Sequence, residues 1–217
     1  MTRNLKISIA LVGAFVVGAA LLLLSPAGDD DDVPEIATAD AEVVRASSHR
    51  LGEPASDGKV TLVEFLDFEC EGCRAAFPLV EDLRERYAGR VTFVARYFPL
   101  SGHFNGERAA RAVQAAAQQD QFEDMYEKMF TTQGEWGESQ TPADDVFRGF
   151  AEELGLDLVQ WDADYDDPAT LERIRVDQAD GRALGVTGTP SFFLNGERLE
   201  IQSADDLTNA IEAALAE

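Results

Sequence analysis

The two cysteines of the chain, Cys70 and Cys73, lie where a strand-like segment meets a helix-like one. Residues 60–66 form a β-branched, apolar run, which is typical of a strand covered on both faces. Residues 73–87 carry apolar side chains at helical spacing and stop before Gly89. The fold must therefore contain a strand that leads directly into a helix bearing both thiols.

The flanking segments predict a mixed α/β domain. Residues 91–98 read as a second strand, and strand–helix–strand order predicts a right-handed crossover with a parallel pair. The turn Asn195-Gly196 between apolar runs is a strong hairpin signal. A helical block of about 80 residues, approximately 104–184, is inserted before this hairpin. Helical patterns cover residues 105–118, 120–130, 141–154, 168–184 and, after the hairpin, 203–215.

The charge of the chain argues against nucleic-acid binding. Forty-one acidic residues against 18 basic ones give a formal net charge of −23. Such a field repels polyanions and anionic membrane surfaces. The acidic residues, including the run over 29–32, are interpreted as a solvated surface.

The N-terminal segment predicts export. An apolar run over residues 7–24 follows Arg3 and Lys6, and four aspartates come after it, so its C-terminal side should face outward. We favour an uncleaved single-pass anchor over 1–27, although small residues at 25–27 also allow signal cleavage and secretion. With either outcome, an acidic tether over 28–56 and a catalytic domain over 57–217 lie outside the cytoplasm, where disulfides persist.

Cys70 and Cys73 are placed for thiol–disulfide exchange. At a helix start, backbone N–H groups and the helix dipole favour the Cys70 thiolate, and the i, i+3 spacing brings Cys73 to the same face. A metal site would need four ligands, whereas only His49 and His103 could add to the two sulfurs. A structural disulfide closing so short a loop would remove little chain entropy.

The run Glu-Phe-Leu-Asp-Phe-Glu-Cys-Glu-Gly-Cys at 64–73, with Thr189-Pro190 downstream, resembles the DsbA-like thiol–disulfide oxidoreductases of the thioredoxin superfamily, in particular the membrane-tethered Gram-positive forms. The resemblance spans about residues 55–217. It implies a thioredoxin fold with a helical insertion and a cis Pro190 beside the cysteines. It also implies that Thr189 contacts the backbone of the substrate.

Three further residues near the cysteines bear on the chemistry. Glu64 is interpreted as a buried proton acceptor for Cys73, or alternatively as an edge glutamate that reaches solvent. Many relatives carry proline and histidine or an aromatic residue between the cysteines, whereas this chain has Glu71 and Gly72. The charge of Glu71 should make Cys70 less acidic, and the disulfide less oxidising, than in the strongest oxidants of the family.

These observations predict a monomeric protein disulfide oxidoreductase that introduces disulfides into exported proteins. Its redox-active pair requires no metal and no organic cofactor, and by family analogy a quinone-linked membrane partner reoxidises it. A membrane-linked reductase is the alternative, and a non-catalytic thioredoxin-fold binding module is the third reading. His103 is interpreted as a structural or surface residue without an assigned mechanism, and we expect Trp136 and Trp161 to lie in the core or line a groove.

Overall fold

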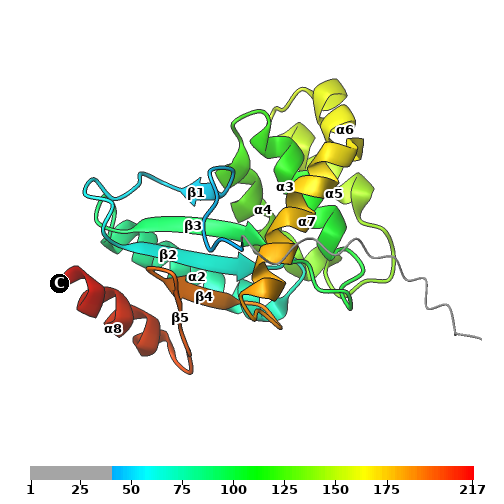
Figure 1. The fold of residues 1–217 in the computed structure, drawn as a ribbon. Helices are drawn as coiled ribbons and strands as arrows, with labels where there is room; N and C mark the ends of the chain where they lie inside the picture. The colour runs from blue at the N-terminus through cyan, green and yellow to red at the C-terminus, as the bar shows by residue number, and fades with distance from the viewer. Residues whose placement is uncertain (1–40) are drawn as a thin grey trace, which may run out of the picture. The chain divides into compact units, whose positions relative to one another are not determined.

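The computed structural model describes residues 41–217, so the predicted anchor over 1–27 lies outside the described residues. From Thr61 onward, the order strand–helix–strand, helical block, hairpin and final helix is the predicted one, with the helical block between the third and fourth strands (Figure 1). The elements are β1 His49–Leu51, β2 Thr61–Leu66, α2 Glu71–Arg86, β3 Thr92–Tyr97, α3 Gly106–Ala117, α4 Phe122–Trp136, α5 Asp144–Glu153, α6 Leu158–Asp166, α7 Pro168–Ala183, β4 Ser191–Leu194, β5 Glu197–Arg198 and α8 Ala204–Leu215.

The strands form one five-stranded sheet in the order β1-β3-β2-β4-β5. The pair β2–β3 is parallel, as the crossover through α2 requires, and the remaining pairs are antiparallel. The hairpin β4–β5 turns at Asn195 and Gly196, both with positive φ. The α/β class and the thioredoxin fold with a helical insertion are thereby confirmed.

The central strand β2 is covered on both faces. Leu62 and Leu66 pack into the larger apolar core together with Val80 and Leu83 of α2. The residues that alternate with them along the strand, such as Phe65, pack into a smaller cluster on the other face. Since side chains alternate along a strand, the two clusters explain why residues 60–66 show almost no polar positions.

The inserted helices pack around α3, which contacts α4, α5, α6 and α7. The inward face of α3 is built largely from alanine, and its buried side chains allow neighbouring helices to approach closely. Helix α6 was not predicted. Its start is marked by Asp157, whose carboxylate accepts hydrogen bonds from Val159 N and Gln160 N. Its buried residues are Trp161 and Tyr165, and the half-buried Leu158 packs against the same core.

The predicted tether over 28–56 extends too far into the domain. Strand β1 pairs antiparallel with β3, and the Nε atom of Arg45 lies 2.5 Å from Asp180 Oδ2. The buried Arg96 guanidinium donates to the carbonyl of Val43 and to the Asp180 carboxylate. A three-residue strand is too short to show periodicity, so this docking could not be predicted from the sequence pattern.

A search of residues 41–217 for a membrane-spanning helix finds none of the required length and hydrophobicity.

Candidate active site

Cys70 is the N-cap residue of α2, four positions after the end of β2. It has an extended backbone, and its carbonyl accepts the first helical hydrogen bond from Arg74 N at 3.1 Å. The thiol lies 3.3 Å from the carbonyl oxygen of Thr189, to which it can donate. Strand β2 therefore delivers the first sulfur to the open end of a helix, as the sequence predicts.

The Cys70 site favours the thiolate. Its pKa is lowered from 9.0 to about 5, chiefly by a hydrogen bond from the Cys73 thiol. Hydrogen bonding by Thr189 and by the backbone N–H groups of Cys73 and Gly72 adds to this, while burial opposes it. At neutral pH, reduced Cys70 is thus a stable thiolate, which makes it a good nucleophile and a good leaving group.

The second sulfur has the opposite character. Cys73 is only 1% exposed, and burial followed by the hydrogen bond it makes to Cys70 raises its pKa well above 9.0. The backbone N–H of Asp67 contacts its Sγ at 3.5 Å. Cys73 therefore stays protonated and shielded when Cys70 is ionised, as a resolving thiol should.

Glu64 lies inside the sheet, so the reading as an edge residue is wrong. It pairs with Ala95 on β3 and Phe192 on β4, and the residue is 5% exposed. Alternation along β2 places it on the α2 side of the sheet, where its charge contributes to the raised pKa of Cys73. Burial, followed by the charge of Cys70, raises the pKa of Glu64 to about 8. A carboxyl group with this pKa can exchange a proton near neutral pH.

The Thr189–Pro190 peptide bond is cis, as the resemblance implies, and it lies against the start of α2. Gly72 is the residue that allows this approach. A Cβ atom at position 72 would lie 3.2 Å from Pro190 Cδ and 3.5 Å from Cys70 Sγ. The missing side chain at position 72 thus makes room for the cis proline.

Glu71 is exposed on the first turn of α2. The pKa of Cys70 is nevertheless lowered, because the hydrogen bonds from Cys73, Thr189 and the backbone together exceed the effect of burial. The expected opposing effect of Glu71 is therefore outweighed locally. Whether this disulfide is less oxidising than that of the strongest oxidants stays a prediction.

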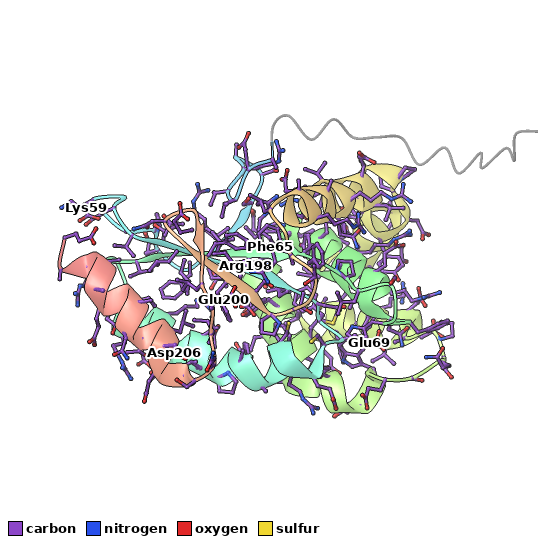
Figure 2. All side chains as sticks on the ribbon, turned by 60° about the horizontal axis from the view of Figure 1, so that its bottom comes forward. Lys59, Phe65, Glu69, Arg198, Glu200 and Asp206 are labelled. Carbon is purple, nitrogen blue, oxygen red and sulfur yellow. The ribbon has the colours of Figure 1, made fainter. Side chains whose placement is uncertain are left out.

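The inserted helices hold residues 67–70, the cysteine loop between β2 and α2, in place. The sequence did not reveal this support. Gln133 on α4 is buried and donates from Nε2 to the carbonyls of Phe68 and Cys70, at 2.6 and 3.0 Å. Glu69 accepts from Asn105 N at 2.5 Å, at the start of α3. Figure 2 shows Glu69 where the start of α2 meets the inserted helices. The loop thus gains fixed partners on two helices.

A second polar group lies on the other side of the loop. The buried Asp67 carboxylate accepts from His103 Nδ1 at 2.6 Å and from Leu100 N at 2.8 Å. His103 and Cys70 both line a hollow of about 390 Å³. The two tryptophans, by contrast, belong to the apolar core: Trp136 and Trp161 are 3% and 2% exposed.

A family model described as "Thioredoxin" matches residues 45–213. The solved structure of a thioredoxin-like oxidoreductase from Silicibacter pomeroyi is 29% identical, with a TM-score of 0.68, covering 82% of this chain and 98% of that one. The alpha-DsbA1 structure from Wolbachia pipientis has a TM-score of 0.69 at 19% identity, covering 80% and 93%, and this likeness concerns the fold alone.

A curated relative, the Na(+)/H(+) antiporter NhaA of Herminiimonas arsenicoxydans, is 38% identical over 159 residues, or 73% of this chain. The aligned part is 24% of that protein, and 26% of a similar antiporter from Mycobacterium. The chain thus spans about a quarter of the length of the curated relatives it matches.

Proposed function

Because the chain belongs to the thioredoxin family and has the DsbA-like form of its fold, we propose that it is an extracytoplasmic thiol–disulfide oxidoreductase. The proposed direction is oxidation: the Cys70–Cys73 disulfide accepts electrons from cysteine pairs of newly exported proteins. The N-terminal segment would tether this monomeric domain to the membrane, and a quinone-linked membrane partner would reoxidise it. The exchange itself needs only the two sulfurs and a proton carrier.

This proposal rests on the opposite pKa shifts of the two cysteine thiols. A pKa of about 5 for Cys70 stabilises the reduced protein as a thiolate, which makes the disulfide a readier electron acceptor. The corresponding value is about 7 in thioredoxin, which works as a reductant, and about 3.5 in the strong oxidant DsbA. The pKa of Cys70 lies between these two values, which supports an oxidant of intermediate strength.

In the proposed reaction, a substrate thiolate attacks Cys70 Sγ and breaks the Cys70–Cys73 bond. Cys73 leaves with the electron pair and takes up a proton, for which the neighbouring Glu64 carboxyl is the donor. The second substrate thiolate attacks the substrate sulfur of the mixed disulfide and expels Cys70 as a thiolate. The substrate loses two electrons, and the protein gains them.

Thr189 and Pro190 are proposed to hold the substrate during this exchange. Both are half-buried beside Cys70, and an extended peptide backbone can pair with the segment that precedes β4. Cys70 is only 9% exposed, and it lines the hollow through which a substrate thiolate would reach its sulfur.

The reductase alternative is favoured by one observation. Glu69, Glu71 and Glu138 line the hollow beside Cys70, and negative charge there opposes the thiolate. A weaker thiolate would lower the reduction potential toward that of thioredoxin. The two directions therefore differ in a measurable quantity.

Equilibration of the pair with glutathione tests the direction. We expect a potential between about −270 mV, as in thioredoxin, and about −120 mV, as in DsbA. Thiol trapping in cells should then find the pair mainly oxidised. A potential at or below the thioredoxin value, with a mainly reduced pair, would establish the reductase instead.

A dithiol-peptide oxidation assay and an insulin-reduction assay test for catalysis itself. The Cys70→Ser variant should lose both activities, because the attacking and leaving sulfur is gone. Unchanged function of that variant in cells would favour the binding-module reading.

A further inference from the structure

The Asp67–His103 pair forms a fixed polar unit beside the cysteines. Asp67 is 1% exposed and follows β2 directly. One carboxylate oxygen accepts from Leu100 N and His103 Nδ1, and the other accepts from Glu69 N at 2.9 Å. With each oxygen occupied, the carboxylate cannot turn, so it fixes the imidazole by its Nδ1–H.

Two backbone contacts of Asp67 connect the Asp67–His103 pair to the two cysteines. The backbone N–H of Asp67 contacts Cys73 Sγ at 3.5 Å, and its carbonyl accepts from Cys70 N at 3.1 Å. On the opposite side, Gly106 leaves space for the carboxylate, since a Cβ there would lie 2.9 Å from Asp67 Oδ1. Asp67 thus joins the histidine, the cysteine loop and the start of α3.

We propose that His103, held by Asp67, supplies the positive charge that stabilises the Cys70 thiolate in the reduced protein. The inference rests on the thiol exchange proposed above and adds a positioning residue from outside the Cys-x-x-Cys motif. His103 and Cys70 line the same hollow, and the charge of Cys70 raises the pKa of His103.

The charges around the hollow determine the state of His103. The carboxylates facing it come from three segments: Asp67 and Glu69 before α2, Glu71 in its first turn and Glu138 after α4. Asp67 first, and then Cys70 and Glu69, raise the pKa of His103 above its ordinary 6.5, against the effect of burial. These charges favour the imidazolium form of the ring, and a positive charge at His103 offsets the repulsion that the carboxylates exert on the thiolate.

The ionisation of His103 and that of Cys70 must influence each other. Reduction creates the Cys70 thiolate, which raises the pKa of His103, and disulfide formation removes that charge. The His103 pKa should therefore be higher in the reduced protein than in the oxidised protein. A histidine with a purely structural role would titrate identically in both states.

Proton NMR of the imidazole rings tests this linkage on the unmodified protein. The chain has two histidines, and burial lowers the pKa of His49 to about 4, so the two signals titrate in separate ranges. We expect the His103 midpoint to shift upward on reduction while that of His49 stays in place. Equal His103 midpoints in the two redox states would overturn the proposal.

A charge-removing variant gives a second readout. His103→Gln keeps a hydrogen-bond donor for Asp67 but loses the charge. The thiolate absorbance midpoint of Cys70 should rise by about half to one pH unit, and the equilibrium with glutathione should shift about threefold to tenfold toward the disulfide. Arg148→Gln, which removes an exposed cation paired with Asp162, is the control and should change neither value.

The outcomes separate this inference from the proposed function. A wild-type protein that is active in exchange but shows no change in the Cys70 midpoint in His103→Gln would contradict the role of His103 alone. A wild-type protein without exchange activity would contradict the proposed function, whereas the NMR titration would still decide whether His103 and Cys70 are coupled.

Discussion

Gly72 faces Pro190 so closely that a Cβ atom at position 72 would lie 3.2 Å from the proline Cδ. The same atom would lie 3.6 Å from the Thr189 carbonyl oxygen. Gly72 and the segment around the cis Pro190 therefore pack directly against each other, although they are far apart in the chain. Several consequences of this arrangement, and of the charges behind it, can be measured.

Gly72→Ala should slow exchange with little loss of stability. The new methyl group must displace Pro190 by a few tenths of an ångström, while alanine gains up to about 1 kcal/mol of helix propensity. We expect turnover to fall about threefold or more, with a nearly unchanged melting temperature. Gly149→Ala on α5, where nothing lies within 4 Å of the new Cβ, is the matched control and should only stabilise. Equal turnover in both variants would contradict the prediction.

Glu64→Gln should slow resolution of the mixed disulfide. Cys73 must lose its proton before it attacks Cys70, and Glu64 accepts this proton in its carboxylate form. In the wild-type protein the rate should rise with pH to a plateau above the pKa of Glu64, which in the mixed disulfide lies below its value of about 8 because Cys70 carries no charge there. The variant should be about tenfold slower at that plateau and lack this inflection. Stopped-flow resolution of a glutathione mixed disulfide measures both, with the exposed Glu107→Gln as control.

Glu64 should also make the reduced protein less stable as pH rises. Its folded pKa of about 8 exceeds the unfolded value of about 4.3, so the folded state holds an extra proton between them. The associated stability is complete below about pH 4.3 and is lost through about pH 8, at up to about 1.4 kcal/mol per pH unit. The lowered pKa of Cys70 acts in the opposite sense, but equally in wild type and variant.

Urea unfolding of reduced wild-type and Glu64→Gln protein at several pH values isolates this effect. The advantage of the variant should grow steadily from pH 5 to pH 8. A stability difference that is independent of pH would show that Glu64 is ionised throughout.

Glu71 should have only a small effect on Cys70, because its carboxylate is exposed and screened by solvent. Titration of the thiolate absorbance in Glu71→Gln should give a Cys70 midpoint only a few tenths of a pH unit lower than in wild type, and the difference should shrink in high salt. The wild-type midpoint should lie near pH 5, above that of the strongest oxidants at about 3.5. A wild-type midpoint at or below the latter value would refute the expected weakening.

Gln133→Ala should destabilise the cysteine loop. It removes two hydrogen bonds and leaves the buried carbonyls of Phe68 and Cys70 without these donors. The expected cost is about 2–3 kcal/mol, together with a slower exchange reaction. Gln119→Ala removes hydrogen bonds to the exposed backbone of Asp157, where water can replace them, and should cost well under half as much. Similar losses in the two variants would argue against a special role for Gln133.

Local patterns determined most of the elements. The apolar run before Cys70, the helical spacing after it and the Asn195-Gly196 turn act over a few neighbouring residues, and each correctly predicted its element. The i, i+3 spacing likewise placed both sulfurs on one helix. Strand β1 escaped prediction because it is too short to show a period, and helix α6 because it has an apolar residue, Val159, on its exposed side as well.

The sequence by itself therefore determined which residues carry the chemistry and which elements bear them. Only the tertiary structure decided what surrounds them. Thr189 contacts Cys70 across 119 positions, Gln133 reaches Phe68 across 65, and His103 reaches Asp67 across 36. Such contacts form when side chains from different elements satisfy one another in a buried site, and this pairing leaves no periodic trace in the chain.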